Sequence, residues 1–146
     1  MADITCVIDT NVLQKANAPL ENEPKAKRKF ARRIALLDRI GRRQLQLLIS
    51  TRLLTEYSSK IQEPRNEFIR MFMELLTAPG GAQRNWHSPW TGASGKARMC
   101  RFPSHDDHVL RTAIAPGGST IYTEEAQMLA TDTCIYRTFR VRISDV

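Results

Sequence analysis

The chain has 146 residues and carries 22 lysines and arginines against 15 aspartates and glutamates, a formal net charge of +7. This length suits one domain around one hydrophobic core, so we expect residues 1–146 to form a single domain. No apolar run approaches the roughly 20 residues that span a bilayer, and the first residues lack the pattern of a signal peptide, so we expect no membrane segment. The excess of positive charge favours a polyanionic partner, nucleic acid first among them.

The cysteines Cys6, Cys100 and Cys134 lie far apart and form neither a CxxC pair nor a zinc-binding pattern. Their odd number argues against a disulfide framework. Cys6 falls in an apolar run, where a buried thiol is the ordinary outcome. We therefore expect reduced cysteines and a cytoplasmic protein.

The first third of the chain predicts a strand, a helix and a second strand. Residues 4–8 are apolar and are followed by the polar sequence Asp-Thr-Asn, as expected for a buried strand of a parallel sheet. Residues 24–41 place apolar side chains at helical spacing, opposite a strongly basic face, and end at a glycine. Residues 45–50, LQLLIS, read as the second buried strand.

The middle of the chain predicts two helices and a long loop. Residues 51–61 and 66–76 carry apolar side chains at helical spacing and end near Pro-containing or Gly-containing sequences. Residues 82–103 show no clean periodicity and contain both tryptophans, so we expect a long irregular loop, with a short strand inside it as an alternative. Loops of this length are usually functional or mobile.

The last third predicts a helix at 104–114, a strand at 119–123, a short helix at 124–130 and a final strand at 139–143. Strands that alternate with helices indicate an α/β domain. We expect a three-layer α/β/α sandwich with a mainly parallel sheet of four to five strands.

Acidic residues recur where these strands end or the following helices begin. Asp9 follows the first strand, and Glu56 lies in the second turn of the helix after the second strand. Asp106 opens a later helix, and Glu125 follows the strand at 119–123. Because the carboxyl ends of parallel strands share one edge of a sheet, we expect these side chains to converge there.

Several carboxylates packed together repel one another and stay ionised only where cations compensate. Hard divalent cations with oxygen ligands, Mg²⁺ or Mn²⁺, meet that need. The sequence therefore predicts an acidic metal site inside a basic surface, a combination suited to phosphodiester chemistry.

Four motifs, VIDTNVL, LLISTRLLTEY, SHDDHVLRTAIA and STIYTEEAQML, resemble in order and spacing those of the PIN domain nucleases, which include the VapC-type toxins. The resemblance implies an Mg²⁺- or Mn²⁺-dependent endoribonuclease that hydrolyses RNA, a homodimer and, for a toxin, an inhibitory antitoxin. It also implies the metal-binding and catalytic residues, which are Asp9, Glu56, Asp106 and Glu125. The supporting residues are Thr10, Asn11, Asp107, Thr123 and Glu124.

The chain departs from the family at the fourth acidic position, where aspartate is usual and this sequence has glutamate. We expect the longer side chain of Glu125 to change metal binding at this position, either by reaching the same ion with a shifted geometry or by reaching it poorly. Glu124 and Asp132 remain alternatives for the fourth acid.

The basic helix is a candidate surface for RNA phosphates, with a solvated charged face as the alternative. The candidate contacts are Lys25, Arg28, Lys29, Arg32 and Arg33. Trp86 and Trp90 either stack on unpaired bases or anchor the loop on the core. His105 and His108 flank the acids, and we expect surface histidines.

Two other functions compete with the nuclease. The first is a PIN-like RNA-binding or scaffold protein whose pocket has lost activity at Glu125. The second is an aspartyl phosphotransfer enzyme of the haloacid dehalogenase type, which also begins with an aspartate at a strand end. That enzyme needs a second aspartate where this chain has Asn11, so it ranks last.

Overall fold

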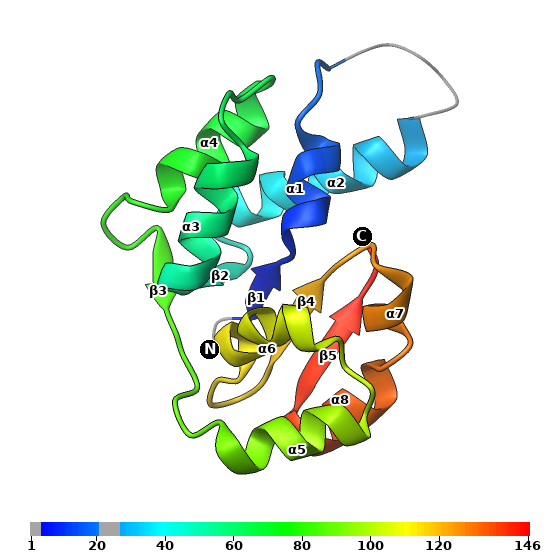
Figure 1. The fold of residues 1–146 in the computed structure, drawn as a ribbon. Coiled ribbons are helices and arrows are strands. Elements are labelled where there is room, and N and C mark those ends of the chain that lie inside the picture. The colour runs from blue at the N-terminus through cyan, green and yellow to red at the C-terminus, as the bar shows by residue number, and fades with distance from the viewer. Residues whose placement is uncertain (1–3, 21–26) are drawn as a thin grey trace.

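The protein is represented by a computed structural model that describes residues 4–20 and 27–146 (Figure 1). Its centre is one sheet of five strands in the order β3-β2-β1-β4-β5, and every pair of neighbours is parallel. The strands are β1 (Thr5–Ile8), β2 (Gln46–Ile49), β3 (Ala82–Arg84), β4 (Ser119–Tyr122) and β5 (Val141–Ser144). The chain winds from β1 outward to β3 and then returns to β4 and β5, so the winding direction reverses between β1 and β4. The carboxyl edge at that point is where open α/β sheets bind ligands.

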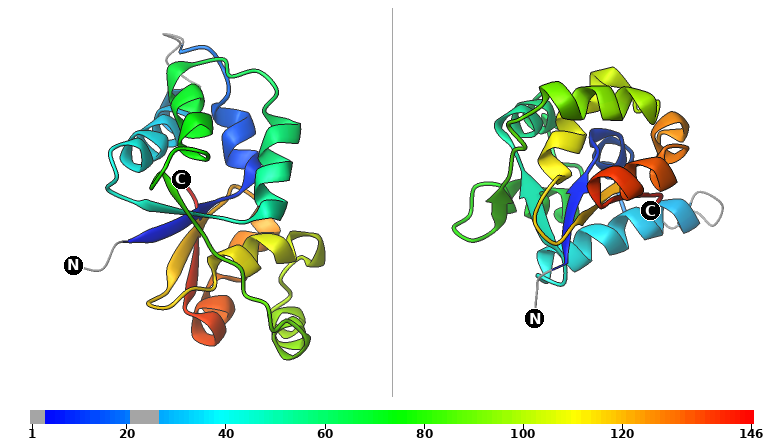
Figure 2. Two further views of the ribbon diagram at one scale, coloured as in Figure 1. Left: turned by 90° about the vertical axis from the view of Figure 1, so that its left-hand side faces the viewer. Right: turned by 90° about the horizontal axis from the view of Figure 1, so that it is seen from below.

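Helices cover both faces of the sheet, which confirms the predicted three-layer α/β/α sandwich. Figure 2 shows α2 and α4 on one face and α6 and α8 on the other. The helices are α1 (Thr10–Ala16), α2 (Lys27–Gly41), α3 (Thr51–Lys60), α4 (Glu67–Leu75), α5 (Thr91–Met99), α6 (Asp107–Ala113), α7 (Ala126–Leu129) and α8 (Asp132–Phe139), with a 3-10 turn η1 (Ser104–Asp106) before α6. The helix predicted over 24–41 ends at Gly41 as expected, and its predicted start lies outside the described residues.

The core lies between the central strands and the helices. Cys6, Val7 and Ile8 are fully buried, as expected for a strand with helices on both faces. Tyr57 on α3 meets Phe72 on α4 edge to face at 5.6 Å between ring centres, and its hydroxyl donates to the carbonyl of Ile8. This packing links the carboxyl end of β1 to the helical layer.

The prediction that residues 82–103 form an irregular loop is wrong, because the segment contains β3 and α5. β3 is an edge strand whose residues are half-buried or exposed, so it lacks the apolar alternation that marks a strand. α5 contains Gly92 and Gly95 and buries only Ala97, so it lacks an apolar stripe. α8 escaped prediction for the same reason, since it buries only Ile135.

The expectation that the cysteines form no disulfide is also wrong, because Cys100 and Cys134 are bonded. Residues 34 apart in the sequence are brought together by the approach of the end of α5 to α8, and sequence spacing does not reveal such contacts. Cys6 is the buried free thiol that was expected, and burial raises its pKa to about 12. Disulfides persist mainly in oxidising compartments, so the cysteines no longer support a reducing one. None of the helices in residues 4–20 and 27–146 is long and apolar enough to cross a membrane.

Candidate active site

Asp9 stands at the carboxyl end of β1 and is the N-cap of α1. Its backbone N–H donates to the carbonyl of Tyr122 at the end of β4 (2.9 Å). One carboxylate oxygen accepts from the backbone N–H of Thr10 (2.9 Å), and the other accepts from the hydroxyl of Thr123 (2.7 Å). The residue is only 5% exposed. Asp9 is therefore held rigidly between β1 and β4.

Glu56 is held by side chains from two other helices. The hydroxyl of Thr10 donates to Glu56 Oε1, and His108 Nε2 on α6 lies 2.7 Å from Glu56 Oε2. His108 is buried, so the expectation of a surface histidine at this position is wrong. Its position two residues after Asp106 placed it near the acids, but only the packing of α6 against α3 turns its ring toward Glu56.

Asp106 and Glu125 face each other beside His105. Asp106 is buried, and its Oδ2 has no hydrogen-bond partner among the described residues. His105 Nε2 lies 3.2 Å from this oxygen without forming a hydrogen bond to it, and 3.8 Å from Glu125 Oε1. One candidate ligand atom from each of these three residues lies within 4.8 Å of the other two. His105 itself is exposed, as expected.

The electrostatics of the site show mutual repulsion among the acids. Burial raises the pKa of Asp9, and the charges of Glu125 and Glu56 add to that rise against the hydrogen bonds from Thr123 and Thr10. Burial also raises the pKa of Asp106 to about 8, and the nearby carboxylates of Glu125 and Asp9 add to that rise. The four acids that the sequence singled out therefore share one electrostatic environment.

The neighbours Glu124 and Glu125 have separate surroundings. Arg33 donates two hydrogen bonds of 2.7 Å to the Glu124 carboxylate, and Lys15 Nζ lies 3.9 Å from it. The backbone N–H of Glu124 donates to the side chain of Asn11 (3.4 Å). The backbone N–H of Glu125 donates to the Thr123 hydroxyl (3.1 Å), and its carboxylate turns to Asp106. Glu125 is thus the one of the pair that lies with the other acids.

Two further acids are occupied by interactions away from the cluster. Asp107 forms an ion pair with Arg98 on α5, so its carboxylate ties α5 to α6. Asp132 accepts from the backbone N–H of Ile143 (2.7 Å) and from Arg142 (3.3 Å). These contacts give Asp107 and Asp132 structural roles.

The basic face of α2 is partly occupied by ion pairs. Arg33 is paired with Glu124, and Lys29 Nζ lies 2.5 Å from Asp145 Oδ2. Arg28 and Arg32 are exposed. Lys25 lies outside the described residues.

Both tryptophans flank one guanidinium group. The Arg111 guanidinium lies 4.1 Å from the ring centre of Trp86 and 5.2 Å from that of Trp90. Trp90 is half-buried against the core, whereas Trp86 is 42% exposed. Trp90 therefore packs on the core, as one of the two alternatives predicted, whereas Trp86 keeps exposed ring surface.

The donor set fits a hard divalent cation. Carboxylate oxygens are the ligands that Mg²⁺ and Mn²⁺ prefer, and Asp106 and Glu125 offer two such groups beside His105. Asp9 lies near enough for its charge to raise the pKa of Asp106. A buried carboxylate oxygen without a hydrogen-bond partner is costly unless a cation satisfies it, and Asp106 Oδ2 is such an atom among the described residues.

Comparison of the chain with protein-family models, with curated proteins and with solved structures finds no match.

Proposed function

We propose that the protein is a metal-dependent ribonuclease that hydrolyses RNA phosphodiester bonds. The observation that carries the proposal is the pair Asp106 and Glu125, two facing carboxyl groups with one unpartnered buried oxygen, beside the rigidly held Asp9. An acidic centre in a chain of net charge +7 suits an enzyme whose metal ion and polyanionic substrate need opposite surroundings.

Each residue has a separate task in this proposal. Asp9, Asp106 and Glu125 hold Mg²⁺ or Mn²⁺, with Glu56 beside them. A bound ion would supply the positive charge that polarises the phosphodiester and acidifies a water molecule. Thr10 and Thr123 fix the orientation of the carboxylates, and His108 fixes Glu56.

Further support comes from the four motifs that resemble those of PIN domain nucleases. If that relationship holds, the protein acts as a homodimer and as the toxin of a toxin–antitoxin pair, with a small antitoxin protein as its inhibitor. We also propose a cytoplasmic location, where RNA substrates are present. Because the cytoplasm is reducing, the bond between Cys100 and Cys134 would form there only under oxidising conditions.

The first test is cleavage of a mixed pool of structured and single-stranded RNAs in Mn²⁺, in Mg²⁺ and in EDTA. We expect cleavage with metal and none in EDTA. Asp9→Asn keeps the size of the side chain but removes the charge, so it should lower the cleavage rate by at least about 100-fold.

The matched control is Asp38→Asn, which makes the same chemical change in the surface ion pair with Arg42 on α2. This variant should cleave at the wild-type rate. Equal loss in both variants, or cleavage that persists in EDTA, contradicts the proposal. RNA binding without cleavage in either metal favours the non-catalytic RNA-binding protein, and Glu125→Asp then tests whether the longer fourth acid is the cause.

A further inference from the structure

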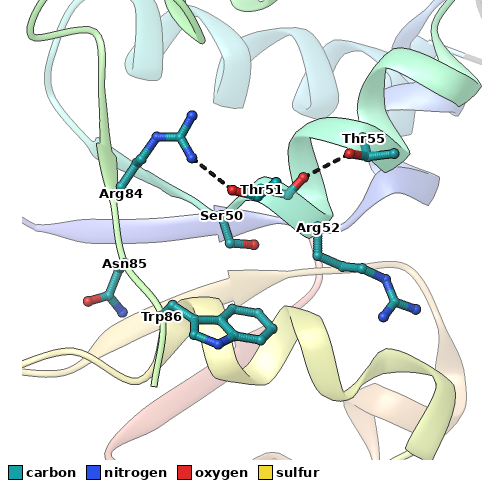
Figure 3. A pocket seen from close by; sticks show the side chains of 7 residues that line it. All are labelled: Ser50, Thr51, Arg52, Thr55, Arg84, Asn85 and Trp86. Carbon is teal, nitrogen blue, oxygen red and sulfur yellow. Dashed lines mark hydrogen bonds between the residues drawn. The ribbon is translucent and has the colours of Figure 1, made fainter. Parts of the chain in front are cut away.

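A cavity of about 670 Å³ opens where the start of α3 faces the segment that follows β3 (Figure 3). This volume is in the range of small-molecule sites. The cavity is lined by Ser50, Thr51, Arg52, Thr55, Arg84, Asn85 and Trp86. None of these residues belongs to the acidic cluster, so the cavity is a separate feature.

The wall made by residues 84–88 is held in place by hydrogen bonds. The side chain of Asn85 donates to the carbonyls of Thr112 and Ile114, at 2.8 Å each. Arg111 donates to the carbonyls of His87 (3.0 Å) and Ser88, and its guanidinium lies over one side of the Trp86 ring. Trp86 is therefore positioned by its neighbours while still 42% exposed, which leaves ring surface free for a planar ligand.

Two cations border the same cavity without an acidic partner. Arg52 and Arg84 form no ion pair within residues 4–20 and 27–146. Arg84 donates to the Thr51 hydroxyl (2.9 Å), which leaves other guanidinium N–H groups available. Arg52 lies in the first turn of α3, where the helix dipole disfavours a cation and favours an anion. Figure 3 shows the Arg84 and Arg52 side chains on opposite sides of Thr51, so each offers a separate contact for a phosphate group.

The cavity also adjoins the acidic cluster. Arg52 and Glu56 are four residues apart on α3, so their side chains leave the same face of the helix one turn apart. Thr55, at the rim, directly precedes Glu56. A ligand that extends from the cavity along α3 toward Glu56 would therefore reach the clustered carboxylates.

We propose that this cavity binds an unpaired nucleotide of a single-stranded nucleic acid, with its base on the open surface of Trp86 and phosphates of the same strand at Arg84 and at Arg52. The inference rests on the proposed nuclease function for its place beside a cleavage centre, but binding itself needs no metal. An aromatic ring and cations together are the usual components of a single-strand site, and a paired base offers no free face for stacking.

The test measures the affinity of the full-length protein for a fluorescently labelled, unstructured 12-nucleotide RNA in EDTA, by anisotropy at several salt concentrations. Trp86→Ala should weaken binding by about 5- to 150-fold, the effect of losing one stacked base. Trp86→Phe should keep most of the affinity, because a phenyl ring still stacks. Arg52→Gln and Arg84→Gln should each lower the slope of log affinity against log salt by about 0.7.

Arg137→Gln is the matched control, since it removes the same charge from the exposed surface of α8, which packs on β5 at the opposite edge of the sheet from β3 (Figure 1). This control should bind as the wild type does, and a duplex of the same sequence should bind more weakly than the single strand. A DNA strand of the same sequence shows whether the ribose hydroxyl contributes to affinity. Loss of affinity in Trp86→Ala for either the RNA or the DNA strand supports the proposed binding site.

The inference is overturned if the wild type binds no single strand, if the duplex binds as tightly, or if Trp86→Ala binds like Arg137→Gln. Thermal melts check that the variants fold, and the two arginine variants carry the test should Trp86→Ala unfold. Cleavage does not enter these measurements. If binding depends on Trp86 but no RNA is cleaved, the binding site stands and the nuclease proposal is refuted. If RNA is cleaved with metal but binding does not depend on Trp86, the nuclease proposal stands and the binding site is refuted.

Discussion

Thr123 contacts two of the clustered acids through one hydroxyl group. The hydroxyl donates to Asp9 Oδ2 (2.7 Å) and accepts from the backbone N–H of Glu125 (3.1 Å), and the residue is fully buried. Asp9 and Glu125 are 116 positions apart in the chain, so Thr123 couples the ends of β1 and β4 in one hydrogen-bonded unit. In the proposed metal site, Thr123 would orient two ligands and so contribute to affinity without touching the ion.

Thr123→Val keeps the shape of the side chain but removes both hydrogen bonds. We expect the affinity for Mn²⁺, measured by isothermal titration calorimetry, to fall by about 10- to 100-fold, because the carboxylates lose their fixed orientation. Thr123→Ser retains the hydroxyl and should restore most of the affinity. Equal Mn²⁺ affinities for the valine variant and the wild type would show that Thr123 does not orient the site.

The elements that carry the site are joined by charged contacts. Arg33 on α2 reaches Glu124 in the segment between β4 and α7, and the two side chains are only 14% and 5% exposed. Arg98 on α5 likewise reaches Asp107 at the start of α6. Each pair connects a helix to the segment that supplies a clustered acid, Glu125 in the first case and Asp106 in the second.

Arg33→Gln should lower the free energy of unfolding by about 3 kcal/mol, because it leaves the buried Glu124 carboxylate with only the more distant Lys15. Urea denaturation measures the loss. The double variant Arg33→Gln, Glu124→Gln should recover most of the stability, since no buried charge is then left unpaired. RNA affinity should remain unchanged in Arg33→Gln if its role is this ion pair. Unchanged stability with weaker RNA binding would assign Arg33 to the substrate surface instead.

At the scale of the whole molecule, the acidic cluster makes stability depend on pH, and we expect a dependence on metal as well. The folded protein raises the pKa of Asp106 to about 8 from the ordinary value of 3.8, with burial as the main cause. The folded state thus binds a proton that the unfolded state has released between these values. Stability therefore falls as pH rises through this window.

In EDTA, we expect the midpoint of thermal unfolding to fall between pH 5.5 and 8.5, by about 4 °C for each kcal/mol lost. Mn²⁺ should reduce or reverse this fall, because the ion binds the deprotonated carboxylates of the folded state. Asp106→Asn should flatten the dependence in EDTA. Differential scanning fluorimetry across this pH range checks all three, and an unchanged slope in Asp106→Asn would assign the effect to other groups.

The sequence alone was enough to predict the α/β/α architecture and the edge of the sheet at which Asp9 lies. Buried strands such as β1 and β2 appear in the sequence as short apolar runs, and a parallel sheet places their carboxyl ends at the same edge. The sequence predicted neither α5 nor α8 and could not place β3 within residues 82–103, because their few buried residues leave no apolar period to detect.

Only the tertiary structure decided which polar groups meet. Glu124 and Glu125 are identical in type and adjacent in sequence, yet one pairs with Arg33 and the other faces Asp106. The same holds for His108, which turns to Glu56, and for Cys100, which joins Cys134. The burial of apolar side chains depends on their local spacing and on composition, so it can be predicted from the sequence. The directions of charges and hydrogen bonds depend on side chains brought together from distant segments, and those meet only after the sheet and helices have packed.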